Sequence, residues 1–252
     1  MIALTHAVTA SLARCELTFL ARQPIDVAKA TLQHGAYCEL LSACGAEVQT
    51  VSVSPEHPDA VFVEDAVVVL DEIAIATVMG TPARRSEVER LVPIVAEHRA
   101  IERIELPATL EGGDVLRIGR VLYVGESPRT NAAGIEALRR IASRHGYRVI
   151  AVPVHGCLHL KTACTALDAG TVLANPAWFD VRPFSDMKIV AVAPGEPFAA
   201  NVLHLGGVLC ASAAHPRTLA NLRSLGYRVR SVDIAELEKA EAGMTCLSVV
   251  IG

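Results

Sequence analysis

A unit made of a helix, a glycine and a strand recurs along the chain and limits the folds that it can adopt. The tetrapeptide Gly-Tyr-Arg-Val occurs twice, beginning at Gly146 and at Gly226. Before each copy, residues 131–145 and 216–225 have the apolar spacing of an amphipathic helix, and after each copy the chain has the alternation of a strand. We therefore expect one α/β unit to be repeated.

Three further segments fit the same unit. Residues 24–53 have a proline near the start of the expected helix, and Gly45 lies just beyond its end. Two copies are weaker. Residues 86–106 contain Pro93 inside the helical pattern, which should kink or break that helix, and residues 187–203 have no obvious long helix. The sequence thus predicts five units.

One such unit cannot bury its own apolar face, so the units should close into a ring or stack on one another. A doubly wound parallel sheet also alternates strands and helices and is the alternative. Polar residues recur at one point of the unit, which favours a five-bladed α/β propeller of strand-strand-helix-strand units around a central channel. These residues are Glu64/Asp65, Glu111/Asp114, His159, Asn201 and Cys246.

The composition is that of one globular domain. The 252 residues are 52% hydrophobic and show no linker-like change of composition, so residues 1–252 are expected to form a single domain. The net charge of -4 gives no basic footprint for nucleic acid but allows an acidic pocket for a cationic ligand. No signal-peptide pattern and no apolar run of membrane length is present, which predicts a cytoplasmic protein without a membrane partner. Its seven cysteines form no paired C-x-x-C knuckles, so free thiols in a reducing compartment are expected.

Three separate segments carry the residue types of a thiol nucleophile and its helpers. Cys246 precedes an apolar β-rich run at the end of the chain. His159 lies earlier in the sequence, and Glu111 lies earlier still. A thiol, an imidazole and a carboxylate together can form a nucleophile, a base and an orienting acid. Among seven cysteines and nine histidines such a trio also arises by chance, and core packing is the alternative for each thiol. The shared place in the repeat favours Cys246 and His159.

Two motifs near these residues have more than one interpretation. Glycines in the run from Glu111 to Asp114 would let a ligand or backbone approach closely, or would simply form a tight turn. His155, Cys157 and Cys164 together with His159 have residue types that bind zinc. Structural zinc sites usually consist of paired knuckles, so no metal is expected.

Charged residues elsewhere suggest a cationic amino-acid ligand. Asp59, Glu64 and Asp65 flank a very apolar segment, where an internal arginine or a cationic ligand should neutralise them. Arg84 and Arg129 lie ahead of expected helices and could clamp a carboxylate, although arginines are more often solvated at the surface.

Seven motifs, taken in order, resemble those of the dimethylarginine dimethylaminohydrolase family in the pentein or amidinotransferase superfamily. The resemblance covers essentially the whole chain, whereas Glu-Gly-Gly-Asp alone would indicate only the superfamily. The motifs are THAV (5–8), PDAVFVED (58–65), TPARR (81–85), TLEGGDVL (109–116), SPRTN (127–131), LHLK (158–161) and TCLS (245–248).

The resemblance implies a five-bladed propeller that hydrolyses Nω-methylated arginine to citrulline and a methylamine. It assigns Cys246 as the nucleophile, His159 as the general acid and base, and Glu111 as the carboxylate that orients His159. The reaction would pass through a covalent S-alkylthiouronium intermediate and need neither metal nor cofactor. The implied substrate-binding residues are Asp59, Asp65 and Glu64 at the guanidinium, Arg84 and Arg129 at the α-carboxylate, and backbone carbonyls of Leu17 and Ala240 at the α-ammonium.

Other functions of the same superfamily stay open. An arginine or agmatine deiminase or an amidinotransferase would use the same trio, although two arginines for an α-carboxylate argue against agmatine, which has none. A non-catalytic propeller such as the ribosome-binding initiation factor has no need of a converging thiol, imidazole and carboxylate. The expected partner is a small cationic amino acid, and a homodimer is one assembly that the sequence allows.

Overall fold

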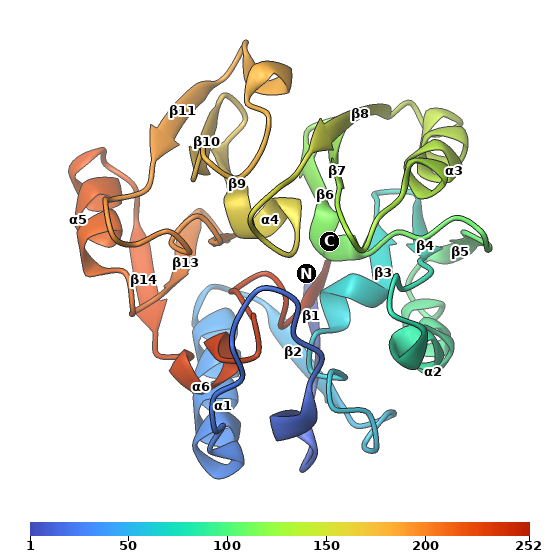
Figure 1. Ribbon diagram of the computed structural model, residues 1–252, viewed down its shortest axis with the longest axis horizontal. Helices are drawn as coiled ribbons and strands as arrows, with labels where there is room; N and C mark the ends of the chain where they lie inside the picture. Colours follow the sequence, from blue (N-terminus) through green and yellow to red (C-terminus); the bar gives the residue numbers. More distant parts are fainter.

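The computed structural model covers residues 1–252 and contains five three-stranded sheets around a common centre (Figure 1). In each sheet two strands pair antiparallel, and the third lies parallel to the middle strand. The chain therefore forms the predicted five-bladed α/β propeller, and the doubly wound sheet is excluded.

The two ends of the chain meet in one blade. Strand β15 (Val249–Ile251) pairs antiparallel with β1 (Ile2–His6), and β1 pairs parallel with β2 (Glu47–Val51). Helix α1 (Val27–Ala43) connects β1 to β2 on the outside of the ring (Figure 1). Because the last strand adds to the first, this pairing closes the propeller.

The other four blades follow in chain order, and α2, α3 and α5 lie on the outside of theirs (Figure 1). Their elements are β3 (Val67–Val69), β4 (Ile73–Ala76), α2 (Arg85–Val95) and β5 (Ala100–Arg103); β6 (Val115–Ile118), β7 (Val121–Glu126), α3 (Ala132–Ser143) and β8 (Arg148–Pro153); β9 (Cys164–Asp168), β10 (Thr171–Ala174) and β11 (Lys188–Ala191); and β12 (Leu203–Leu205), β13 (Val208–Ser212), α5 (Pro216–Ser224) and β14 (Val229–Val232).

The remaining helices are short. The blade of β9, β10 and β11 has the 3-10 helix η5 (Arg182–Phe184) in place of a long helix, as expected from its sequence. The others are η1 (Leu12–Arg14), η2 (Val63–Ala66), η3 (Pro82–Arg84), η4 (Gly112–Asp114), α4 (Leu160–Ala163) and α6 (Ala235–Glu238). None of the helices combines the length and the apolar character that a membrane crossing requires.

The glycine of the repeat ends a helix. Gly45, Gly146 and Gly226 follow α1, α3 and α5 with φ values of 93°, 76° and 91°. This left-handed conformation suits glycine, which has no Cβ, and it commonly stops a helix and turns the chain. The repeated sequence pattern therefore has a local conformational cause.

Pro93 does not break α2, contrary to the expectation. The helix continues through Pro93 and ends at Val95. A proline inside a helix costs about 3 kcal/mol, because it removes one hydrogen bond and crowds the preceding turn. Burial of Leu91, Val92 and Val95 against the neighbouring sheet holds this last turn in place.

The first strand of each blade lies innermost, and the turn before it carries the recurring polar residue. Strands β3, β6, β9, β12 and β15 line a common space along the axis. The turns before them hold Asp65, Asp114, His159, Asn201 and Cys246. All seven cysteines are free, as expected, and only Cys38 is not fully buried.

Candidate active site

The turns that precede β3, β9 and β15 contribute to a small cavity, which with the open space at its mouth encloses about 320 Å³. Seven of the ten residues selected from the sequence line it, and they come from segments that are far apart in the chain. They are Asp59, Asp65, Arg84, Arg129, His159, Ala240 and Cys246.

His159 and Glu111 form a buried pair at this cavity. His159 Nε2 lies 2.8 Å from Glu111 Oε2, and both side chains are almost completely buried. The other oxygen of Glu111 accepts a hydrogen bond from the backbone N–H of Gly80 at 3.0 Å and lies 3.5 Å from Arg129 Nη1. Glu111 does not line the cavity; it lies behind the imidazole, as an orienting carboxylate should.

Opposing effects set the pKa values of this pair. Burial alone would lower the pKa of His159, but Asp65, Asp114 and Glu111 together raise it to about 9. Burial alone would raise the pKa of Glu111, but the hydrogen bond and charge of His159, with Arg84 and Arg129, lower it to about 2. At neutral pH the resting pair is therefore an imidazolium and a carboxylate.

Asp114 holds the backbone next to His159 in place. Its carboxylate accepts hydrogen bonds from the backbone N–H of Leu160 at 2.9 Å and from Ser127 Oγ at 2.6 Å. Because Leu160 follows His159 and begins α4, this contact fixes the backbone from which the imidazole projects.

The two glycines of the Glu-Gly-Gly-Asp motif allow close approach. A Cβ on Gly113 would lie 2.5 Å from His159 Nδ1 and 2.8 Å from Asp65 Oδ1, and a Cβ on Gly112 would lie 1.9 Å from the carbonyl oxygen of Glu64. The backbone N–H of Gly113 donates to Asp65 Oδ1 at 3.2 Å. The motif thus forms a tight turn and also lets Glu64, Asp65 and His159 approach its backbone closely, so the two interpretations are compatible.

Cys246 is held as a neutral thiol. Its Sγ accepts a hydrogen bond from the backbone N–H of Gly243 at 3.4 Å, and 8% of the residue is exposed. Burial raises the pKa of Cys246 to about 12, and the charges of Glu64 and Asp65 act in the same direction. A cation placed in the cavity would oppose both carboxylates and favour the thiolate.

The two aspartates differ in their partners. Asp65 Oδ2 lies 2.9 Å from Arg84 Nη1, so an internal arginine neutralises it. Both Asp59 oxygens accept only from the backbone N–H of Glu16, at 3.2 Å, although Asp59 is 4% exposed. Burial raises the pKa of Asp59, with Arg84 opposing the shift. Asp59 is therefore the carboxylate that lacks a contacting cation and faces the cavity.

Both arginines are buried, so the surface interpretation is wrong for them. Arg84 also forms an ion pair with Glu87 at 3.1 Å, which leaves its charge balanced by two carboxylates. Arg129 Nη2 donates to Thr18 Oγ1 at 2.9 Å, which ties Arg129 to the N-terminal segment.

Besides Glu111, two selected residues lie outside the cavity. Glu64 forms an ion pair with Lys161 and accepts a hydrogen bond from Thr245 Oγ1 at 2.7 Å, on the side of the innermost strands. Leu17 packs against the core, and its neighbour Glu16 lines the cavity instead.

The sequence reasoning missed five cavity residues: Glu16, Phe62, Leu158, Glu241 and Ala242. Four of them adjoin a residue or motif that was selected. Glu241 has a φ of 62°, which is unusual for a residue with a side chain, and its carboxylate accepts the backbone N–H groups of Thr18, Phe19 and Leu20. It thereby holds the N-terminal segment over the cavity.

The zinc hypothesis receives no geometric support. Only Asp65, Glu111 and His159 bring three potential donor atoms within 4.8 Å of one another. His155 and Cys164 do not join them, and Cys157 lies in the core with its Sγ donating to the His159 carbonyl at 3.4 Å.

Comparisons with known proteins agree on one family. A family model described as N,N dimethylarginine dimethylhydrolase, eukaryotic, matches residues 13–165. The N(G),N(G)-dimethylarginine dimethylaminohydrolase of Streptomyces coelicolor is 42% identical over 98% of this chain and 95% of that protein. Its counterpart from Pseudomonas aeruginosa is 36% identical over 88% of this chain and 89% of that protein. A solved structure of a cysteine-to-serine mutant of the Pseudomonas aeruginosa protein, complexed with citrulline, has a TM-score of 0.93 and 33% identity, covering 98% of this chain and 97% of that one.

Proposed function

We propose that this chain, which belongs to the dimethylarginine dimethylaminohydrolase family, hydrolyses Nω-methylated arginine to citrulline and dimethylamine or methylamine. The observation that carries the proposal is one cavity lined by a buried thiol, by His159 with Glu111 behind it, and by Asp59, which contacts no cation. Residues 1–252 act as one catalytic domain in the cytoplasm, and the partner is a small cationic amino acid.

The substrate cation has a defined place in this proposal. Its guanidinium donates to Asp59, whose oxygens contact no cation, and lies beside Asp65. Its α-carboxylate is bound chiefly by Arg129, because Arg84 is already balanced by Asp65 and Glu87. The carbonyls of Ala240 and of the Leu17 segment take the α-ammonium.

Binding of the cation prepares the nucleophile. The positive charge offsets the carboxylates that raise the pKa of Cys246, so the thiol releases its proton to solvent where the substrate is bound. The thiolate then attacks the guanidinium carbon and forms a tetrahedral adduct. His159, protonated at rest, donates a proton to the methylated nitrogen. The C–N bond breaks, dimethylamine leaves, and an S-alkylthiouronium remains on Cys246.

The second half of the reaction uses the same histidine as a base. Neutral His159 takes a proton from a water molecule, whose oxygen attacks the thiouronium carbon. The C–S bond breaks, citrulline is released and the sulfur leaves as a thiolate, which regains a proton. Glu111 stabilises the imidazolium formed in this step and keeps the ring oriented. His159 thus gives the proton to the departing amine and takes one from the attacking water, while the thiol proton of Cys246 is exchanged with solvent.

Citrulline release from asymmetric dimethylarginine, monomethylarginine and arginine, together with ammonia release from agmatine, tests the proposal. We expect asymmetric dimethylarginine and monomethylarginine to be converted with a kcat/KM about 10- to 200-fold above that of arginine, the usual value of an added apolar contact. Agmatine should not react, because it has no carboxylate for Arg129. Equal or faster conversion of arginine would make the chain an arginine deiminase, and no conversion of any guanidine would contradict the proposal.

A methyl group on Gly113 should disable the site without unfolding the protein. The Gly113→Ala variant would force its Cβ into His159 and Asp65, and a displacement of about 1 Å at a reacting group costs on the order of 100-fold in rate. Turnover of dimethylarginine and the thermal midpoint measure the two effects. Gly35→Ala is the matched control, since nothing lies within 4 Å of its new Cβ in α1. Full activity of Gly113→Ala would show that His159 does not need its present position.

A further inference from the structure

Asn201 is the recurring polar residue of the blade formed by β12, β13 and β14, and the proposed reaction gives it no role. It is 6% exposed and uses both ends of its amide. Nδ2 donates to the carbonyl of Lys161 at 3.0 Å and lies 3.2 Å from Thr245 Oγ1, while Oδ1 accepts the backbone N–H of Thr245 at 2.9 Å. These partners fix the orientation of the amide, because a carbonyl can accept only from the amide NH₂ and a backbone N–H can donate only to the amide oxygen.

The two segments that Asn201 contacts carry the reacting groups. Lys161 follows His159 by two residues in α4, and Thr245 directly precedes Cys246. One side chain therefore joins the backbone that presents the imidazole to the backbone that presents the thiol. Asn201 itself does not line the cavity that contains Cys246.

Asn201 also explains why residue 243 is a glycine. A Cβ on Gly243 would lie 2.3 to 2.7 Å from Cγ, Nδ2 and Oδ1 of Asn201, and its three nearest atoms all belong to that side chain. Gly243 does not have a left-handed φ, so its backbone conformation would accept alanine. The close contact matters because the backbone N–H of Gly243 donates to Cys246 Sγ.

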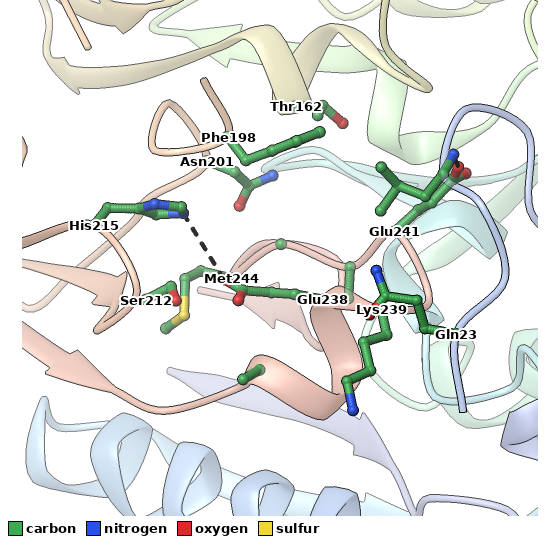
Figure 2. A pocket seen from close by; sticks show the side chains of 14 residues that line it. Gln23, Thr162, Phe198, Asn201, Ser212, His215, Glu238, Lys239, Glu241 and Met244 are labelled. Atoms are coloured by element: carbon green, nitrogen blue, oxygen red, sulfur yellow. Dashed lines mark hydrogen bonds and ion pairs between the residues drawn. The ribbon is translucent and has the colours of Figure 1, made fainter. Parts of the chain in front are cut away.

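A second cavity, which with the open space at its mouth encloses about 790 Å³, adjoins this turn. Figure 2 shows Asn201 and Thr162 on its wall, together with Met244, and Gly243 also lines it. Glu241 and Ala242 line both this cavity and the one that contains Cys246. Residues 241 and 242 thus separate the two cavities, and such a thin wall needs lateral support to keep one geometry.

This support comes from a closed ring of hydrogen bonds and one ion pair. Thr245 Oγ1 donates to Glu64, Glu64 pairs with Lys161, and Asn201 links the Lys161 carbonyl back to Thr245. Glu64, which does not line the cavity with Cys246, has its place in this ring.

We propose that Asn201 is a positioning residue for the nucleophile: its amide, packed against Gly243, fixes the turn that carries Cys246 relative to the segment that carries His159. The consequence for turnover rests on the proposed function, whereas the consequence for the thiol does not. Loss of Asn201 should lower kcat and leave KM nearly unchanged, because the substrate is not in contact with it.

A double-mutant cycle tests this assignment. We expect Gly243→Ala to lower kcat about 100-fold by forcing the turn away from Asn201, and Asn201→Ala to lower it to a similar extent by releasing the turn. In the Asn201→Ala background the added Cβ has room, so Gly243→Ala should then cost less than about threefold. Additive losses in the two variants would overturn the proposal. A Gly243→Ala variant whose kcat lies within about twofold of wild type would also overturn it, and this outcome can be measured even if Asn201→Ala does not fold.

Inactivation by 2-chloroacetamidine provides a readout that requires no substrate. This cationic reagent alkylates Cys246, and its rate constant should fall about tenfold in each single variant, since a 1.4 kcal/mol loss in placing the thiol is a factor of ten. Asn175→Ala is the matched control. The Asn175 amide also donates to a backbone carbonyl, that of Pro197, but neither residue lines the cavity that contains Cys246. If the wild type released no citrulline, the proposed function would fail, and the alkylation cycle would still decide the role of Asn201. Unchanged inactivation rates in folded variants would reject it.

Discussion

Replacing Cys246 by alanine is expected to abolish citrulline formation, with a loss of about 10⁴-fold or more, while the fold is kept. Removal of a covalent nucleophile is among the most damaging changes for an enzyme, because no other group can form the intermediate. No other cysteine lines the cavity, so none can replace it. Stability should fall by only about 1 kcal/mol, since one small buried group is lost.

Serine at the same position should be nearly as inactive as alanine. A hydroxyl is far less acidic than a thiol, and the burial that raises the pKa of Cys246 to about 12 would keep a serine protonated even beside the substrate cation. Release of citrulline, followed over hours at high enzyme concentration, measures the residual rate of both variants.

Cys157 is the matched control for this experiment. It is also buried and its Sγ contacts the carbonyl of His159, yet it belongs to the core and does not line the cavity. Cys157→Ala should therefore lose stability to a similar degree and keep its activity within about threefold. If Cys246→Ala retained a tenth of the wild-type rate, or if Cys157→Ala were the inactive variant, the nucleophile would be misassigned.

Local features made the fold and part of the site predictable from the sequence. The repeat was visible because its glycines end helices in a left-handed conformation, as at Gly146 and Gly226, and this depends on a few neighbouring residues. Equivalent polar positions of a closed repeat must meet near one axis, so His159 and Cys246 were found by their place in the unit.

Features that depend on distant parts of the chain were not predictable. Glu64 and Asp65 are adjacent, but η2 directs only Asp65 to the cavity and leaves Glu64 to pair with Lys161. Glu241 holds backbone N–H groups more than 200 positions away in sequence, and backbone donors leave no pattern in a sequence. The same is true of Asn201, whose partners are backbone groups of two other blades.

The buried pair of His159 and Glu111 should make stability depend on pH within a defined window. The folded pKa of His159, about 9, lies above its ordinary value of 6.5, so its stabilising effect is complete below pH 6.5 and is lost as pH rises through 9. The folded pKa of Glu111, about 2, lies below its ordinary value of 4.5, so its effect is complete above pH 4.5 and is lost as pH falls through 2. The pair therefore stabilises the protein most between pH 4.5 and 6.5.

Glu111→Gln is expected to weaken this stabilisation and to remove most of the activity. The amide keeps the shape of the carboxylate but not its charge, so the pKa of His159 should fall, with only Asp65 and Asp114 left to oppose burial, and less of the imidazolium that protonates the leaving amine would be present. We expect kcat to fall by about 10²- to 10⁴-fold, the usual contribution of acid-base catalysis.

Between pH 4.5 and 6.5 the free energy of unfolding of Glu111→Gln should lie roughly 3 kcal/mol below that of the wild type, as for other broken buried pairs, and this difference should shrink as pH approaches 9. Denaturant unfolding at a series of pH values measures it, with Glu102→Gln as the control, because Glu102 lies 3.3 Å from His145 Nε2 in a partly exposed pair worth at most about 1 kcal/mol. A Glu111→Gln variant whose stability loss is the same at pH 5.5 and pH 9 would show that the pair is not ionised in the folded protein, and the histidine would then have to begin the reaction as a base.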